Sequence, residues 1–521
     1  MQPGRPLCDR ATGGTSGLDR RRFLGIAGTG LLGSLSDCGP SPAGLANGPS
    51  EADWEGLKGQ IAGSILRPGD AEYDQARVLY NTRFDTVFPQ AIARCSSAGD
   101  VAAVLAFVRR FSLAVTPRSG GHSYAGYSSG NGMVIDVGGM RSIQVGEGTA
   151  TIGAGARLVD VYDQLTAQGV AIPSGSCASI GIAGITQGGG VGIVDRAFGL
   201  TCDRLVSAQV VTADGRILLC DAENEPDLFW ALRGGGGGNF GVVTSLTFLT
   251  HRTSDLTNFY AGFPMESALD VLAAWQAWLK DLPDWVWSGL GMFFSADPPN
   301  PFQLSVSGVS ISDQETFAPL WSALLGATGV RPTVESVELL SYRATLLSYA
   351  CGSLSVSECH LPGQTADAAL TRQAFTASSD LFDLWLPAKG IGALVEAMTS
   401  RYQSGRRGGV LVDSMGGAIG RVPSDATAFV HRSSVLSAQY LAQFPQGTSS
   451  DTVAEAVSWT HGMRAVMQPW SSGRAYQNYI DPQIGNWQTA YYGSNYPRLV
   501  RVKAAYDPGS VFRFPQGIPP Q

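Results

Sequence analysis

Two glycine-rich loops constrain this 521-residue chain more than any other feature. The first, at 117–124, reads Pro-Arg-Ser-Gly-Gly-His-Ser-Tyr and carries His122. The second, at 172–192, begins Ile-Pro-Ser-Gly-Ser-Cys, carries Cys177 and continues through a run of glycines. Glycine permits positive φ and has no Cβ, so backbone N–H groups in such loops can approach an anionic ligand closely. The two loops therefore predict a cradle for a phosphorylated cofactor, with an imidazole and a thiol directed into it.

Composition narrows the class of partner. The formal net charge is -7 and the pI is near 5.3, which argues against nucleic acid or an anionic membrane as the main partner. None of the eight cysteines or five histidines has the spacing of a zinc site, so we expect no metal. Cys351 and Cys359 are able to form a disulfide if the protein is exported, which the sequence leaves open. We expect a small-molecule substrate; the oligomeric state stays undetermined.

Residues 1–46 have the features of an export signal. Asp-Arg-Arg-Arg-Phe-Leu at 19–24 resembles a twin-arginine motif, and the apolar run that follows, at 26–35, is too short to span a bilayer. We therefore expect cleavage near Ala46, an extracytoplasmic protein and no membrane anchor. Two alternatives stay open, a lipoprotein attached at Cys38 and a basic N-terminus without a targeting role.

The first part of the mature chain, 81–255, has the pattern of one α+β unit. Apolar residues at helical spacing predict a helix at 97–111, capped by Ser97, and a second at 158–168 whose end leads into the Cys177 loop. A turn at Asp214-Gly215 between apolar runs predicts a hairpin of 206–211 with 217–219.

The next part, 256–470, has a different pattern. An amphipathic helix is predicted at 267–282, and strands are predicted at 302–306, 410–412 and 428–430. Together these elements predict a largely antiparallel sheet with helices on one face.

Two glycine-containing motifs match known binding or catalytic patterns but lack the flanking secondary structure that those patterns require. Gly236, Gly238 and Gly241 match G-x-G-x-x-G, but they follow a predicted helix, whereas a dinucleotide fold needs a strand before them, so NAD binding is excluded. The stretch 126–130 matches G-x-S-x-G, but a turn and a strand follow it rather than a helix, which argues against a serine nucleophile.

Taken together, the Arg-Ser-Gly-Gly-His-Ser and Pro-Ser-Gly-Ser-Cys loops resemble those of the berberine-bridge-enzyme-like flavoprotein oxidases, which share the fold of vanillyl-alcohol oxidase and p-cresol methylhydroxylase. In the subgroup with both loops, a histidine bonds the 8α-methyl carbon of FAD and a cysteine bonds C6. The resemblance implies that His122 and Cys177 take those roles. It covers the chain from about Thr82 to the C-terminus.

The resemblance also implies the domain plan. After an N-terminal segment at 47–80, it predicts an FAD-binding domain of two subdomains at 81–255 and a substrate domain at 256–470. The C-terminal segment, 471–521, is expected to return to the flavin. Further FAD-binding residues implied by the family motifs are Arg118, Ser119, Gly120, Gly121, Ser123, Gly126, Ser174, Gly181, Gly184, Gly189, Gly190, Gly192, Asn239, Gly241, Val242, Val243, Asn478 and Tyr479.

For the chemistry, the resemblance implies oxidation of an alcohol or hemiacetal. We expect Tyr479 to take the hydroxyl proton while hydride passes to flavin N5, after which O2 becomes H2O2. A free tyrosine titrates near pH ~10, so a tyrosine base needs neighbours that lower its pKa. Tyr476 and Tyr124 are alternative bases. Some members carry a second tyrosine before a Gly-Gly-Ala-Ile-like stretch; Met415 stands there in this chain, which casts doubt on two successive oxidations.

Two covalent bonds to the flavin imply a cleft that is open to a bulky substrate. We expect a glycosylated or polycyclic secondary metabolite of antibiotic type. The alternatives are an oligosaccharide oxidised at its reducing-end C1, and a flavin dehydrogenase or oxidative cyclase. A non-redox carbohydrate-binding protein would not need both loops.

Overall fold

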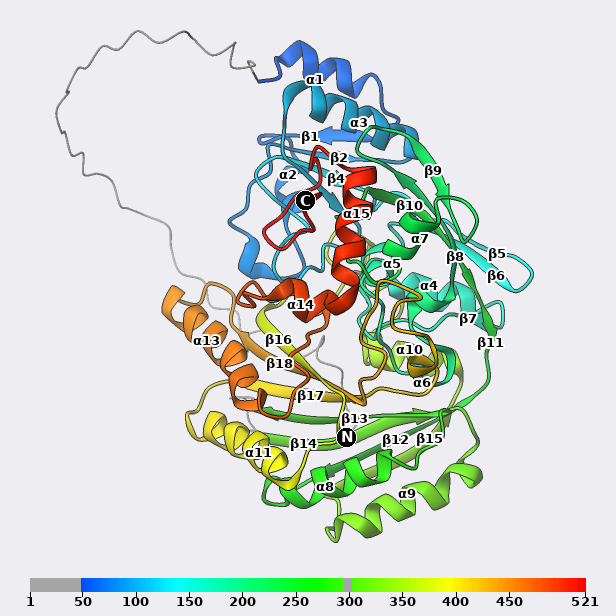
Figure 1. Cartoon of the computed structure of the whole chain (residues 1–521), viewed down its shortest axis with the longest axis vertical. Coiled ribbons are helices and arrows are strands. Elements are labelled where there is room, and N and C mark those ends of the chain that lie inside the picture. The colour runs from blue at the N-terminus through cyan, green and yellow to red at the C-terminus, as the bar shows by residue number, and fades with distance from the viewer. Residues whose placement is uncertain (1–47, 295–301) are drawn as a thin grey trace, which may run out of the picture.

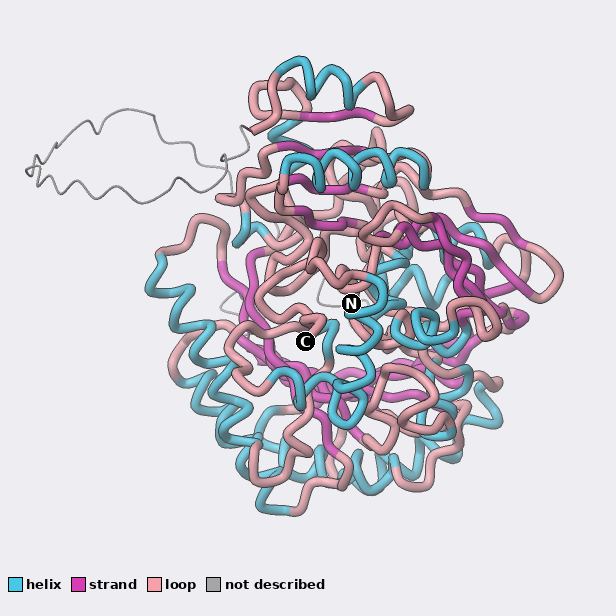
Figure 2. The backbone as a smooth tube through the Cα atoms, turned by 45° about the horizontal axis from the view of Figure 1, so that its top comes forward, coloured by secondary structure: helices cyan, strands magenta, loops and turns pink. Residues whose placement is uncertain are grey.

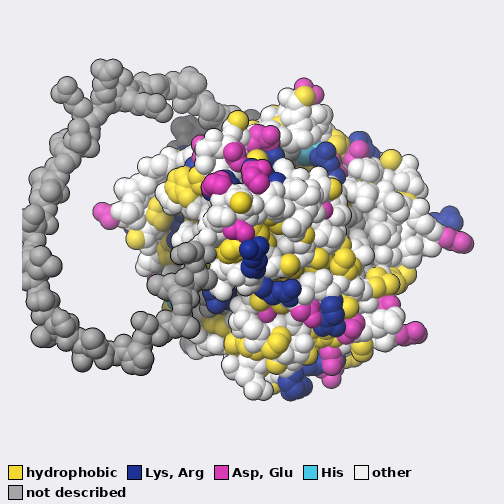
Figure 3. All heavy atoms as spheres, turned by 90° about the horizontal axis from the view of Figure 1, so that it is seen from above, with side chains coloured by type: hydrophobic (Ala, Val, Ile, Leu, Met, Phe, Trp, Pro, Cys, Tyr) yellow, Lys and Arg dark blue, Asp and Glu magenta, His cyan; other side chains and the backbone are white. Residues whose placement is uncertain are grey.

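A computed structural model describes residues 48–294 and 302–521 (Figure 1). The export signal expected at 1–46 lies outside the described residues. No helix in the described ranges is long and apolar enough to cross a membrane. On the face seen in Figure 3, basic and acidic side chains lie among apolar ones, and neither sign forms a continuous field.

The loop that contains His122 follows a strand of the first sheet. Its strands, in spatial order, are β1 (Ser64–Leu66), β2 (Ala91–Arg94), β4 (Met133–Asp136) and β3 (Val115–Arg118). β1 is antiparallel to β2, and the other pairs are parallel. The helices of this part are α1 (Glu51–Lys58), α2 (Tyr73–Arg77) and α3 (Ala98–Phe111). The 3-10 turn η1 (Thr82–Phe84) lies between α2 and β2. Because β1 pairs with β2, the segment 47–80 adds a strand to this sheet.

The second sheet is antiparallel and lies beside the first. Its strands, in spatial order, are β5 (Ile143–Val145), β6 (Thr149–Gly153), β10 (Val242–Leu249), β8 (Leu205–Val211) and β9 (Ile217–Cys220). A small antiparallel pair joins β7 (Val170–Ala171) and β11 (His251–Arg252). The connecting helices are α4 (Leu158–Thr166), α5 (Ile182–Gln187), α6 (Asp195–Phe198), the 3-10 turn η2 (Thr201–Arg204) and α7 (Pro226–Ala231). The buried face of α4 packs on the core, so its end sets the start of the Cys177 loop.

The third sheet has seven antiparallel strands and forms the lower half of Figure 1. In spatial order they are β15 (Val334–Leu340), β12 (Leu256–Phe263), β14 (Phe302–Ser310), β13 (Val286–Phe294), β17 (Gly408–Ser414), β18 (Leu436–Phe444) and β16 (Ala374–Phe382). The outer face is covered by η3 (Met265–Ser267), α8 (Ala268–Leu279), α9 (Gln314–Thr328), α11 (Ala388–Gln403) and α13 (Ser450–Met467). Figure 2 shows these helices below the strands, so the opposite face of the sheet points to the first two sheets.

The remaining elements link the two halves. Helix α10 (Tyr342–Cys351) packs against α4, helix α12 (Ala418–Arg421) packs against α6, and a disulfide joins Cys351 to Cys359. The C-terminal segment contains η4 (Gln477–Tyr479), α14 (Trp487–Tyr492), η5 (Gly493–Asn495) and α15 (Tyr496–Tyr506). The ammonium of Lys503 on α15 is buried and donates to the carbonyl of Asn239 at 2.6 Å, which ties this segment back to the second sheet.

The architecture expected from the sequence is confirmed: an α+β fold whose second half is an antiparallel sheet covered by helices. The hairpin of β8 and β9 is confirmed, and Ser97 caps α3 by accepting a hydrogen bond from the N–H of Asp100. The strand predicted at 428–430 is wrong. There the N–H groups of Ala428 and Phe429 donate to the carbonyls of Trp230 and Arg233, so this segment bonds a loop of the other half instead of a sheet.

Candidate active site

One cavity of about 470 Å³ lies where the loops of the first two sheets meet the inner face of the third. Its walls come from both glycine-rich loops, from the C-terminal segment and from the inner face of β13, β14, β17 and β18. Motifs that are far apart in the sequence therefore converge on a single space.

His122 reaches this cavity from the end of β3. The guanidinium of Arg118, the last residue of that strand, pairs with Asp136 of β4 at 2.7 Å and fixes the point where the loop leaves the sheet. The imidazole stacks on Tyr80, with ring centroids 4.1 Å apart. Burial, with a smaller contribution from the positive charge of Arg157, lowers the pKa of His122 to about 3. The ring is therefore neutral at physiological pH and can act as a nucleophile.

The Cys177 loop is held against the His122 loop. The Arg157 guanidinium donates to the carbonyl of Ser119 at 2.7 Å, which links the start of α4 to the first loop. A Cβ on Gly120 would lie 2.1 Å from the amide nitrogen of Gly181, so the two loops touch backbone to backbone. Cys177 itself is partly exposed, is not part of a disulfide, and lines the same cavity as the imidazole.

Most of the predicted cofactor-binding residues line this cavity. They are Arg118, Ser119, Gly120, Gly121, His122, Ser123, Cys177, Gly181, Gly184, Gly192, Asn239, Gly241, Val242, Val243, Asn478 and Tyr479.

Four predicted residues lie behind the cavity wall instead: Gly126, Ser174, Gly189 and Gly190. Gly190 has φ of +90°, and a Cβ there would lie 2.1 Å from the Thr201 hydroxyl. A Cβ on Gly126 would lie 2.6 Å from the ring of Phe84. These positions are glycine because the cavity wall packs closely there. A sequence motif does not distinguish a glycine required for packing from one that contacts a ligand.

The 3-10 turn η4 brings Tyr479 to the cavity. Its ring stacks on Tyr124, with centroids 5.3 Å apart, and stands edge-on to Tyr476 at 4.9 Å. Burial raises the pKa of Tyr479 well above its ordinary value, and the nearby Tyr124 and Asp413 raise it further. A tyrosine base needs the opposite shift, so the phenol of Tyr479 stays protonated at neutral pH.

Asp413 on β17 is a candidate functional residue that the sequence analysis missed. It pairs with Gly289 of β13, where its carboxylate lies 3.0 Å from the position that a Cβ would take, and it lines the cavity. Burial raises the pKa of Asp413 to about 7, which suits a general base that works near neutrality. Strand alternation was the available signal: Val410 and Val412 face the helices, so residue 413 must face the other way.

The cavity fits FAD. A Cβ on Gly184 would meet nothing within 4 Å, so backbone is exposed to the cavity at that point. Arg513, Tyr127 and Phe514, which the sequence analysis also missed, line the same cavity. The rings of Tyr127 and Phe514 are 5.2 Å apart. A guanidinium suits a diphosphate, and aromatic rings suit a planar heterocycle.

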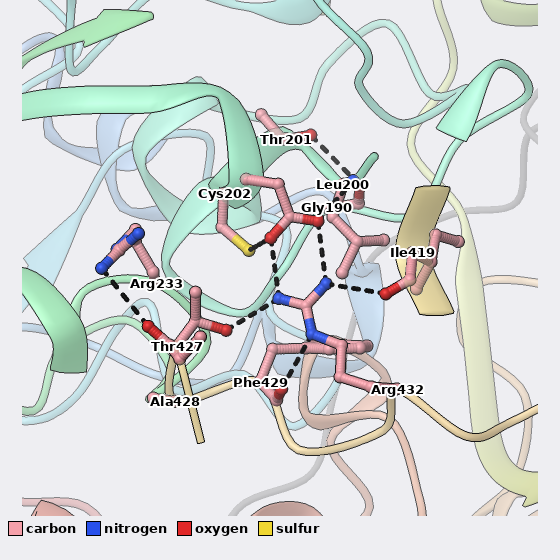
Figure 4. A network of polar contacts seen from close by, with 12 residues as sticks. Gly190, Leu200, Thr201, Cys202, Arg233, Ile419, Thr427, Ala428, Phe429 and Arg432 are labelled. Carbon is pink, nitrogen blue, oxygen red and sulfur yellow. Dashed lines mark hydrogen bonds and ion pairs between the residues drawn. The ribbon is translucent and has the colours of Figure 1, made fainter. Parts of the chain in front are cut away.

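A buried polar network surrounds the side chain of Arg432 (Figure 4). The guanidinium of Arg432 is at its centre and donates to both carboxylate oxygens of Asp203, at 2.7 and 2.8 Å. It also donates to the carbonyl of Phe429 at 3.2 Å. The Phe429 ring stands edge-on to Tyr476, with centroids 6.2 Å apart. The hydroxyl of Tyr476 in turn accepts the N–H of Gly190 at 2.9 Å, so this network supports the wall of the cavity.

Comparison with known proteins decides the family. A family model described as FAD binding domain matches residues 89–221, and one described as Berberine and berberine like matches residues 475–519. The FAD-linked oxidoreductase YgaK of Bacillus subtilis is 31% identical over 474 residues, which cover 89% of this chain and 98% of that protein. The chain belongs to the berberine-bridge-enzyme-like FAD-linked oxidoreductases.

Within this family, the chitooligosaccharide oxidase of Gibberella zeae is 30% identical and covers 87% of this chain and 92% of its own. A solved structure of a chitooligosaccharide oxidase has a TM-score of 0.80 at 27% identity, with 90% of this chain and 99% of that one covered. The glucooligosaccharide oxidase from Acremonium strictum shares the fold, with a TM-score of 0.79 at 24% identity over 89% of this chain and 99% of that one, and is described as carrying a 6-S-cysteinyl, 8α-N1-histidyl FAD.

Proposed function

We propose that this FAD-linked oxidoreductase is an oxidase. It converts an alcohol or hemiacetal carbon of a bulky, hydroxylated substrate to a ketone or lactone, and the two electrons and two protons removed convert O2 to H2O2. One observation carries the proposal. The carboxyl of Asp413 and the phenol of Tyr479 share a cavity with the imidazole of His122 and the thiol of Cys177.

Asp413 accepts the proton of the substrate hydroxyl. The pKa of its carboxyl is raised to about 7, so it is ionised in a large part of the protein at neutral pH and still basic enough to take a proton. Tyr479 keeps its own proton and holds the substrate oxygen by a hydrogen bond. FAD, when bound, supplies the acceptor for the two electrons.

We further propose that FAD is attached through both His122 and Cys177. The two loops that carry these residues are in backbone contact, the imidazole is neutral, and the Cys177 sulfur is not in a disulfide. Two attachments would hold the cofactor without burying it, and would leave the inner face of the third sheet free for a bulky substrate.

Acid precipitation tests the attachment. Wild-type pellets should stay yellow, as should those of His122→Ala and Cys177→Ala, because one bond remains in each single variant. Only the double variant should lose its colour to the supernatant. Cys220→Ala is the matched control, since Cys220 is a buried free cysteine outside the cavity. Colourless wild-type pellets would refute covalent attachment, and a colourless single variant would leave one bond only.

A peroxide assay tests the reaction and the substrate class. One panel contains oligosaccharides, which the chitooligosaccharide oxidase relative supports, and the other contains glycosylated and polycyclic aglycones of antibiotic type. H2O2 released in a one-to-one ratio with oxidised product is expected. Flavin reduction by substrate without peroxide would instead indicate a dehydrogenase or an oxidative cyclase.

We propose that the protein is exported. The disulfide between Cys351 and Cys359 supports this, because such bonds persist in oxidising compartments. Replacing Arg20 and Arg21 together by lysine should retain the protein in the cytoplasm, as measured by cell fractionation. Unchanged export of that variant would contradict a twin-arginine signal.

A further inference from the structure

The inner face of β13 and β14 has only small residues at its centre. Gly289 and Gly291 of β13 pair with Ser307 and Ser305 of β14, and all four residues line the cavity. We call these four residues the glycine trough. The Trp287 ring lies 3.3 Å from the position of a Cβ on Gly289 and borders the trough on the same strand. Asp413 borders it at Gly289.

Phe293 lies at the far end of this trough, flat on the sheet. Its Cε2 and Cδ2 lie 3.1 and 3.4 Å from the position of a Cβ on Gly291. Its opposite edge, Cδ1 and Cε1, lies 2.0 and 2.3 Å from the position of a Cβ on Gly409 of the neighbouring strand. The ring therefore spans two glycines and packs one face on bare backbone. A side chain at Gly409 would occupy the space of the ring.

The other face of this ring is available to a ligand. Phe293 is partly exposed and lines the cavity, whereas its neighbour Met292 is fully buried against the helices. Gln303 lies directly opposite Phe293 on β14 and also lines the cavity. An aromatic face stacks on the apolar face of a ring, and an amide beside it can both donate to and accept from hydroxyl groups. This pair of side chains suits a hydroxylated ring.

We propose that Phe293 is a stacking platform for a substrate ring beyond the one that reacts, and that Gly409 is glycine so that the platform can lie flat. The inference rests on the proposed function, because Asp413 marks the reacting end. Phe293 follows Gly289 by four positions, which is about 13 Å along a strand. That span exceeds a single six-membered ring, so the site takes an elongated substrate of linked, hydroxylated rings, such as a glycan or a glycoside.

A ladder of substrates tests the platform. The probes are glucose, cellobiose, cellotriose and cellotetraose, with the wild-type holoenzyme assayed for peroxide and titrated by the visible absorbance of its flavin. KM and the dissociation constant should fall by about 3- to 10-fold as the chain becomes long enough to reach Phe293, with kcat little changed.

The variants separate the platform from general packing. Phe293→Leu keeps bulk but removes the aromatic face, so the gain with length should disappear while glucose is unaffected. Phe293→Tyr should restore the gain. Gly409→Ala should abolish it with Phe293 still present, because the new Cβ displaces the ring. Gly326→Ala is the matched control, since a Cβ there meets nothing within 4 Å.

The outcomes distinguish the two proposals. The platform is overturned if affinity does not increase with substrate length in the wild type, or if that increase persists in both Phe293→Leu and Gly409→Ala. Oxidation of glucose in such a case would still support the proposed function. A wild-type enzyme that forms no peroxide with any sugar or aglycone contradicts the proposed function itself, and the platform with it.

Discussion

Burial shifts the pKa of Asp413 and of Tyr479 in the same direction, with opposite consequences for the roles that we propose for them. Both lose solvent, and in both the pKa rises because the charged form is disfavoured. For the carboxyl, this shift ends at about 7, within the range of a useful base. For the phenol, the same shift moves titration away from neutrality. Tyr479, which the motif indicated, lines the cavity, and the base that we propose is the carboxyl of Asp413, which lines it too.

Asp413→Asn should reduce kcat/KM by about 10²- to 10⁴-fold, because the amide cannot accept the proton. In the wild type, kcat/KM should fall as the pH drops through about 7 and Asp413 becomes protonated; the variant should lack this dependence. Steady-state kinetics between pH 5 and pH 9 (roughly two units either side of the pKa) would measure both. The control is Asp380→Asn, since the pKa of Asp380 is also raised to about 7 by burial but its side chain does not line the cavity.

The same carboxyl predicts a pH-dependent stability. The folded-state pKa of Asp413 is raised, so its stabilising contribution is present at acid pH and is lost as the pH rises through about 7. Above that pH the buried carboxylate opposes folding. Asp413→Asn should therefore raise the free energy of unfolding by about 1–3 kcal/mol at pH 8 and leave it nearly unchanged at pH 4. Urea unfolding at the two pH values tests this, and a variant less stable than wild type at pH 8 would contradict it.

At the scale of elements, the C-terminal segment and the glycine-rich loops together form one wall of the cavity. The turn η4 has Tyr476 before it, and the Tyr476 hydroxyl accepts the N–H groups of Gly190 and Val191 at 2.9 and 3.2 Å. It also accepts from the amide of Asn478 at 2.8 Å. A short turn near the end of the chain is thus bonded to a loop nearly three hundred residues earlier. The position of Tyr479 depends on that bond.

Tyr476→Phe should destabilise the protein by about 1–3 kcal/mol, because buried N–H donors lose their acceptor. It should also raise KM, since η4 and Tyr479 would be less firmly held. Urea unfolding and steady-state kinetics measure the two effects. The control is Tyr73→Phe. The hydroxyl of Tyr73 is buried and donates to the carbonyl of Pro89, and Tyr73 does not line the cavity. In this variant the stability should fall while KM stays the same. Equal KM in Tyr476→Phe and wild type would contradict the supporting role.

At the scale of the whole molecule, the two halves are joined by buried polar contacts as well as by apolar packing. Asp203 belongs to the half with the glycine loops, and Arg432 follows α12 in the other half; their side chains are 8% and 3% exposed. Arg196 of α6 similarly donates to the carbonyls of Val286 and Met415, at the ends of β13 and β17. These contacts set the inner face of the third sheet against the glycine loops.

Asp203→Asn should therefore cost about 3–5 kcal/mol, because it leaves the Arg432 guanidinium buried without its counter-charge. The exposed pair of Arg343 and Asp163 provides the matched control, and Asp163→Asn should cost at most about 1 kcal/mol. Guanidinium unfolding followed by flavin absorbance and far-UV circular dichroism would show the two halves separating in Asp203→Asn as non-coincident transitions. If Asp203→Asn unfolds with coincident transitions and wild-type stability, the Asp203–Arg432 pair does not hold the two halves together.

The sequence by itself determined the fold class and, through the resemblance of its two loops to a known family, the two candidates for covalent attachment. Glycine loops, helical periodicity and turn residues are local signals, and they act through backbone conformation that neighbours in sequence already specify. The hairpin of β8 and β9 and the cap of α3 followed from such signals. The tertiary structure alone decided which residues share the cavity. Asp413 and Phe293 matter only because strand register sets them beside glycines of adjacent strands, and the segment 428–430 forms a loop because its hydrogen-bond partners lie in the other half. Register and burial depend on contacts across hundreds of residues, which no local pattern encodes.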